Sequence, residues 1–205
     1  MKHDRDLAGE RRRSRRDLFV KAAAGAGLLT AAAVGPIDGL MSTTWAQAPR
    51  QSDVEVVKLA QSIELAAVAA YGAARQTGLL DSPGTAALTL FAGHHQEHAD
   101  SFDQMLGEQM VTDPNRQILS VYLAPIQGAT DQTGILEVAL KIEEAMASTY
   151  LFDLGQIGTD GAKLLASILP VESQHATALG TLLRKPAADY LPSVLETDAA
   201  LHPAG

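Results

Sequence analysis

The chain of 205 residues contains no cysteine and few aromatic residues. The absence of cysteine excludes disulfide bonds, thiolate metal ligands and cysteine nucleophiles. Phenylalanine, tryptophan and tyrosine make up only 4% of the chain, whereas apolar residues, many of them alanine and leucine, make up 46%. Because alanine and leucine are strong helix formers, this composition predicts a single all-α domain rather than a sheet protein.

Basic residues are scarce outside the amino-terminal part of the chain. Residues 1–48 hold eight of the sixteen Lys and Arg residues and five of the 24 Asp and Glu residues. The rest of the chain carries eight basic against nineteen acidic side chains, a net charge of −11. Such a surface repels phosphate backbones, so we expect no binding to nucleic acid.

Residues 1–48 have the features of an export signal. The basic sequence RRRSRRDLFVK at 11–21 precedes an apolar run at 22–34, and the small-residue sequence Ala46-Gln47-Ala48 follows later. The apolar run is shorter than the roughly 20 residues of a transmembrane helix, which favours a leader. Residues 14–21 are similar to the twin-arginine pattern, which implies that the twin-arginine export machinery moves the folded protein out of the cytoplasm.

The processing of this leader has two interpretations. Pro49 follows Ala48 directly and would hinder a signal peptidase at that bond. Cleavage therefore falls nearby, or the leader remains as a membrane anchor. Both interpretations predict a periplasmic or otherwise extracytoplasmic protein, whereas a basic solvated tail would leave the apolar run unexplained.

Four helical segments are expected in a domain over residues 49–185. Breaks containing Gly or Pro separate them. The segments are residues 53–78, 84–109, 133–155 and 161–185. The connection from Glu108 to Thr133 is much the longest, so the chain forms two helical hairpins joined by one crossover.

Two further features lie in the carboxy-terminal part of the chain. Pro170 either kinks the fourth helix or marks a later helix start. Residues 186–205 form a tail that either folds across the bundle or stays mobile.

The two hairpins resemble each other in sequence. IELAAVAAY from Ile63 matches IEEAMASTY from Ile142, and HQEHA from His95 matches ESQHA from Glu172. The offsets are 79 and 77 residues, so the halves align almost without gaps. Packing duplicated hairpins about a pseudo-twofold axis would bring both sets of polar residues to the centre of the bundle.

Helical spacing places a titratable side chain at mid-height on the apolar face of every helix. Core positions recur at alternating intervals of three and four residues, and this spacing includes Glu64, His95, His98, Glu143, Glu172 and His175. Burying an unpaired ion costs on the order of several kcal/mol, so we expect one or two cations to balance these groups. Carboxylate and imidazole ligands without thiolate suit iron or manganese, with zinc as a further candidate.

This pattern resembles the ferritin-like superfamily over roughly residues 53–185. The nearest resemblance is to exported bacterial proteins with a twin-arginine leader before a single ferritin-like domain. The resemblance implies a four-helix bundle with a di-iron or di-manganese centre. It also implies these ligands: Glu64 and Glu143 as terminal carboxylates, Glu172 and His175 as one Glu-x-x-His pair, and His98 as the histidine of the other pair.

His95 stands where the family pattern has a glutamate that bridges two metals. Neutral imidazole has a single lone pair and does not bridge as a carboxylate does. The site is therefore asymmetric, binds one metal, or binds two metals with a hydroxide bridge. A rotated helix would instead present Glu97 and His94, but it would turn Phe91 and Phe102 outward, so both residues are expected at the flank or surface.

A metal-free interpretation also exists for each inward residue. Glu143 with His175, or Glu64 with His98, can form a hydrogen-bonded pair without any ion. Tyr71 and Tyr150 are expected to be core residues, and either hydroxyl can hydrogen-bond a ligand carboxylate.

Three functions follow from these patterns. The first is a metal protein of the cell envelope, with the activity of a non-haem di-metal oxidoreductase on peroxide or dioxygen. The second is metal sequestration or stress protection without turnover, and the third is a metal-free structural bundle. A homo-oligomer is compatible with all three, and metal content separates the third from the others.

Overall fold

The computed structural model describes residues 51–190 and 197–201, so the expected leader at 1–48 lies outside the described residues. All described residues fall in one compact unit, Trp45–Gly205. Helices, turns and loops account for them, with no strand among the residues described. The α-helices are α2 (Gln51–Gln76), α3 (Ser82–Leu106), α4 (Arg116–Gly128), α5 (Gln132–Asp153) and α6 (Thr159–Leu182). The short 3-10 helices η2 (Gly107–Gln109) and η3 (Ala187–Asp189) complete the set.

The helix starts follow from local capping. Asp81 accepts a hydrogen bond from the Gly84 N–H at 2.8 Å at the start of α3. Asp131 does the same for Gly134 at 3.0 Å at the start of α5. These carboxylates satisfy backbone donors that have no partner inside the helix. The four expected segments are confirmed, each boundary lying within three residues of its expected place.

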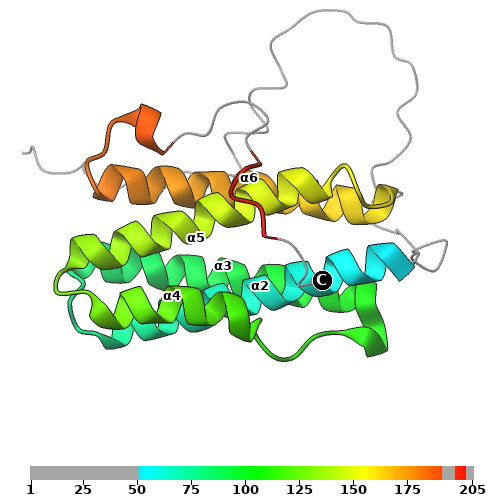
Figure 1. Cartoon of the computed structure of the whole chain (residues 1–205), viewed down its shortest axis with the longest axis horizontal. Helices are drawn as coiled ribbons and strands as arrows, with labels where there is room; N and C mark the ends of the chain where they lie inside the picture. Colours follow the sequence, from blue (N-terminus) through cyan, green and yellow to red (C-terminus); the bar gives the residue numbers. More distant parts are fainter. Residues whose placement is uncertain (1–50, 191–196, 202–205) are drawn as a thin grey trace, which may run out of the picture. The chain divides into compact units, whose positions relative to one another are not determined.

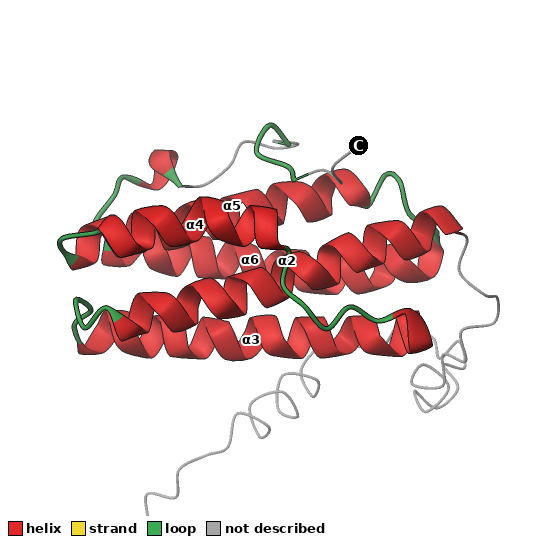
Figure 2. Ribbon diagram, turned by 60° about the horizontal axis from the view of Figure 1, so that its bottom comes forward, coloured by secondary structure: helices red, strands yellow, loops and turns green. Residues whose placement is uncertain are grey.

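Two hairpins form the bundle, as the sequence predicts. Helix α2 packs along α3, and α5 packs along α6 (Figures 1 and 2). Helix α2 is long and apolar enough by composition to cross a membrane, but 61% of its apolar window is buried in the bundle. That burial suits a core helix. Helix α6 runs through Pro170 without interruption, so a later helix start at this proline is wrong.

The long crossover is confirmed, but half of it is helix α4 rather than loop. This helix packs against α2 and α5. Asn115 caps its start by accepting from the Ile118 N–H at 3.1 Å. Ile126 is fully buried, and Ile118 and Tyr122 pack on the same core. Pro125 by itself disfavours a helix here. Packing of the apolar face on the core stabilises the helix despite this proline.

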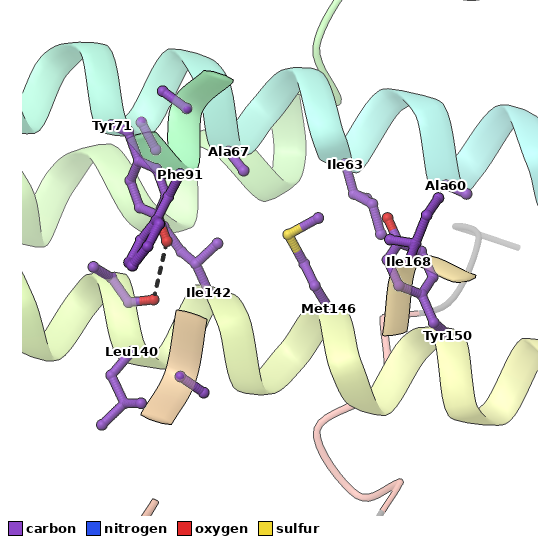
Figure 3. Close-up of a cluster of buried hydrophobic side chains, with 14 of the residues drawn as sticks. Ala60, Ile63, Ala67, Tyr71, Phe91, Leu140, Ile142, Met146, Tyr150 and Ile168 are labelled. Atoms are coloured by element: carbon purple, nitrogen blue, oxygen red, sulfur yellow. Dashed lines mark hydrogen bonds between the residues drawn. The ribbon is translucent and has the colours of Figure 1, made fainter. Parts of the chain in front are cut away.

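The core fills the space between the hairpins. Its largest buried side chains come from all five helices, and include Ile63, Tyr71, Phe102, Ile126, Met146, Tyr150 and Leu165. Figure 3 shows Tyr71 directed from α2 toward α5, and Tyr150 directed from α5 toward α2, with Met146 between them. Apolar and aromatic side chains from both hairpins therefore pack against one another in the interior.

The described part of the carboxy-terminal tail, residues 186–190 and 197–201, folds against the bundle, and the rest of the tail lies outside the described residues. Tyr190 and Leu201 pack on the core. The Leu201 N–H also donates to the Thr149 hydroxyl of α5 at 2.8 Å. Gly180 makes room for this packing, because a Cβ there would lie 2.3 Å from the Tyr190 ring.

We expect Gly180→Ala to release the tail from α6. Alanine favours the helix, but its methyl group must displace Tyr190, so the free energy of unfolding should fall by about 1–3 kcal/mol. The matched control is Gly93→Ala on α3, where an added Cβ meets nothing within 4 Å. That variant should gain about 0.5–1 kcal/mol. Urea denaturation measures both values, and an equal gain in both variants would show that Tyr190 does not depend on Gly180.

Candidate metal centre

All six residues predicted from spacing converge at the centre of the bundle. Glu64 comes from α2, Glu143 from α5, and the other four from α3 and α6. They fall into two overlapping groups of four, each with its candidate ligand atoms within 4.8 Å of one another. The first group is Glu64, His95, His98 and Glu172; the second is His95, Glu143, Glu172 and His175. Either group could hold a metal ion.

Burial of this cluster is nearly complete. The three glutamates and His95 have no exposed side-chain surface, and His175 has 3%. His98 is the most open member at 12%. Electrostatic interactions are correspondingly strong there, because little water screens them.

His95 lies between Glu64 and Glu143. Its Nδ1 is 2.7 Å from Glu64 Oε2, and its Nε2 is 3.2 Å from Glu143 Oε1. The ring thus links α2 to α5 through α3. A glutamate at this position would have two acceptor oxygens instead of two nitrogens.

Glu172 occupies the space between His98 and His175. Its Oε1 is 2.9 Å from His98 Nδ1, and its Oε2 is 3.3 Å from His175 Nδ1. Despite these short distances, neither oxygen of Glu172 has a well-aligned hydrogen bond, and the same holds for His98 Nδ1. Buried groups are normally hydrogen-bonded. Atoms that converge without aligned bonds are expected where their lone pairs share a cation, so oxygen and imidazole donors here fit a divalent ion.

Two tyrosines donate hydrogen bonds to Glu143 and Glu64 across the bundle. The Tyr71 hydroxyl of α2 donates to Glu143 Oε1 of α5. The Tyr150 hydroxyl of α5 donates to Glu64 Oε1 of α2 at 2.5 Å. Burial, followed by the charge of the neighbouring glutamate, raises the pKa of each tyrosine well above 10.0, which keeps both hydroxyls protonated as donors. The expected contact between tyrosine and carboxylate is therefore present in both halves of the repeat.

The carboxylates make the buried imidazoles basic. Burial disfavours charged His98, but contacts with Glu172 and Glu64 outweigh it and raise its pKa to about 9. The pKa of His95 is also raised, because the charges of Glu143 and Glu172 exceed the cost of burial. Burial lowers the pKa of His175, but hydrogen bonds with Glu143 and Glu172 outweigh this effect and raise it. Without a metal, protonated imidazoles therefore offset part of the negative charge.

Glu143 responds in the opposite sense. Burial alone would raise the pKa of this carboxyl. The charge of His95 and hydrogen bonds from His175 and His95 overcome that effect and hold the pKa well below 4.5. The carboxylate therefore stays ionised, as a metal ligand must be.

His94 lies half-buried at the flank of the cluster, as expected, and its side chain contacts His175. Its Nδ1 lies 2.8 Å from His175 Nε2, and the two rings stack with centroids 5.1 Å apart. Glu97 is exposed and Phe91 is buried, so the rotated-helix alternative is wrong. The position of His94 three residues after Phe91, at the edge of the core stripe, is the sequence signal for this contact.

Comparison with known proteins agrees with this geometry. No curated protein and no solved structure matches the chain. The family model for the ferritin-like domain matches residues 52–185. That range spans α2 to α6 and all six candidate ligands. The chain therefore belongs to the ferritin-like domain family, and its bundle contains a Glu and His cluster that could bind a metal ion.

Proposed function

We propose that this protein binds iron or manganese at the centre of its bundle, with zinc as the further candidate. The observation that carries the proposal is Glu172, whose two fully buried oxygens face His98 and His175 without aligned hydrogen bonds. A divalent cation would satisfy these lone pairs and offset the surrounding carboxylates. It would also supply redox chemistry, since iron and manganese change oxidation state.

An activity on peroxide or dioxygen is the leading form of this proposal. The protein supplies a centre shielded from bulk water, negative charge that favours the higher oxidation state, and the Tyr71 and Tyr150 hydroxyls as hydrogen-bond donors to Glu143 and Glu64. Sequestration without turnover uses the same ligands. Consumption of peroxide by the metal-loaded protein distinguishes the first function from the second.

Elemental analysis tests metal binding directly. Protein purified from metal-replete cells is expected to contain iron or manganese, and Glu172→Ala combined with His175→Ala should contain none. Removing both residues eliminates donors from both halves of the centre. Wild-type protein without iron, manganese or zinc would contradict the proposal and leave a structural bundle. The raised pKa values of His95, His98 and His175 favour the metal-free structural bundle as the alternative, because protonated imidazoles can offset the carboxylates without an ion.

We also propose export through the twin-arginine machinery, on the pattern at residues 14–21. Arg15→Lys with Arg16→Lys keeps the charge but removes the paired arginines. In a bacterium with this machinery, the variant should remain in the cytoplasm as the precursor, as fractionation and immunoblotting would detect. The matched control, Arg11→Lys with Arg12→Lys, should be exported normally. Equal export of both variants would contradict the proposal.

A further inference from the structure

The two halves of the centre are not equivalent, and His95 is the main reason. A neutral imidazole has one N–H donor and one lone pair. The shorter contact of His95 is from Nδ1 to Glu64 Oε2 at 2.7 Å, against 3.2 Å from Nε2 to Glu143 Oε1. This difference favours Nδ1–H as the donor to Glu64. Without an ion Nε2 also carries a proton and donates to Glu143; an ion that displaces this proton would meet the Nε2 lone pair in the half that contains Glu143.

His175 shows the same arrangement from the opposite helix. Its Nδ1 is 3.3 Å from both Glu143 Oε2 and Glu172 Oε2. Its Nε2 is 2.8 Å from His94 Nδ1 on the outer side. Imidazoles that bind a metal through one nitrogen usually donate the other N–H to a neighbouring acceptor. Both imidazoles of this half therefore have the outer contact that such a ligand needs.

The half that contains Glu64 lacks these features. Both oxygens of Glu64 already accept hydrogen bonds, one from Tyr150 and one from His95. His98 has no counterpart of His94, because the 77-residue offset that relates His98 to His175 relates His94 to Val171. Valine neither donates nor accepts a hydrogen bond. The oxygens of Glu143 also have partners, namely Tyr71, His95 and His175. The halves therefore differ in their imidazoles: two with an outer contact, His95 and His175, face the Glu143 half, whereas His98 alone belongs to the Glu64 half.

We propose that the centre holds one ion rather than two, bound by His95 Nε2, Glu143, Glu172 and His175, and that Glu64 and His94 are positioning residues for its imidazoles. The proposal rests on the metal binding proposed above and specifies its stoichiometry and ligands. These two nitrogen and two oxygen donors would hold one divalent ion, and water would complete its coordination. Glu172, with both oxygens lacking aligned partners, belongs to both groups of candidate ligands.

The pseudo-symmetric pair His98 and His175 gives the sharpest test. Equilibrium dialysis of the full-length, metal-free protein against Mn²⁺, followed by elemental analysis, should find one ion per wild-type chain. His175→Gln should weaken binding at least about 100-fold, because it removes a ligand. His98→Gln should still bind one ion, with affinity changed by less than about 10-fold. Two ions per wild-type chain, or equal losses in both variants, would overturn the proposal.

Glu64→Gln and Glu143→Gln form a second matched pair. The Glu64 variant should still bind one ion, with affinity lowered by about 10- to 100-fold, as expected for an outer partner of a ligand histidine. The Glu143 variant should lose more than that. Circular dichroism melts of all variants establish that each protein folds. A larger loss in Glu64→Gln than in Glu143→Gln would place the ion in the opposite half and contradict the assignment.

His95→Glu tests the origin of the single-ion site. This substitution adds a carboxylate that can bridge, so stoichiometry should rise from one to two ions per chain. The Mn²⁺ electron paramagnetic resonance spectrum should change from that of an isolated ion to that of a coupled pair. A stoichiometry that stays at one would show that His95 does not limit the site. No ion in loaded wild-type protein would refute metal binding itself, whereas two ions would refute only the single-ion assignment.

Discussion

Glu143→Ala should destabilise the metal-free protein by about 3–5 kcal/mol, as expected when one partner of a buried charged network is removed. Glu143 lies beside the imidazoles of His95 and His175 and accepts a hydrogen bond from the Tyr71 hydroxyl. Its loss leaves a buried hydroxyl without this acceptor and removes one of the carboxylates beside each of the two imidazoles. Urea denaturation after removal of metal by a chelator measures the difference in the free energy of unfolding.

Glu137→Ala is the matched control on the same helix. Glu137 is 49% exposed and pairs with Lys185 at 3.3 Å. Loss of such a surface pair should cost less than about 1 kcal/mol. If Glu143→Ala instead stabilised the metal-free protein, the cluster would be strained without an ion, and pairing among its own residues would not account for its burial.

The metal-free protein should become less stable as pH rises through 6.5 to 9. The pKa of His98 is raised from 6.5 to about 9 in the folded state. The stability that this shift contributes is fully present below the unfolded value and is lost as the pH passes the folded value. A shift of this size corresponds to about 3 kcal/mol. The pKa values of His95 and His175 are also raised in the folded state, so both residues add to the loss of stability as pH rises.

Acid should destabilise the protein through the opposite linkage. The lowered pKa of Glu143 contributes stability above its unfolded value of 4.5, and this contribution is lost as pH falls below that value. Maximum stability is therefore expected between about pH 4.5 and 6.5. Thermal melts from pH 4 to pH 9.5 would locate it. His98→Gln should reduce the alkaline slope, and stability that increases up to pH 9 would contradict the assigned shifts.

The helices and the inward residues were predictable because both depend on local rules. Spacings of three and four residues determine which side chains share a helical face. Glu64 and Glu143 therefore appeared at matching heights before any packing was known. The repeated Ile-Glu and His-Ala sequences added a second constraint, since equivalent positions in duplicated hairpins meet near their axis.

The features that could not be predicted depend on contacts between distant segments. Helix α4 contains Pro125, and its helical state is stabilised by burial of Ile126 against the bundle. The tail lies on α6 because Gly180 admits Tyr190. Helical spacing places His94 beside the core stripe, but it does not reveal that His175 Nε2 would meet it. These outcomes need the relative position of two elements, which periodicity within one element does not contain.

Each hairpin donates a hydrogen bond from a tyrosine hydroxyl to a glutamate of the other hairpin, so neither hairpin satisfies its own buried glutamate. Tyr71 satisfies a glutamate of the second hairpin, and Tyr150 satisfies a glutamate of the first. Mutual donation of this kind has the form of an isologous contact in a twofold dimer. Two copies of one ancestral hairpin could have made both bonds with a single tyrosine and a single glutamate. Within a single chain the two copies can differ, as His95 and Glu172 do at equivalent positions of the repeat.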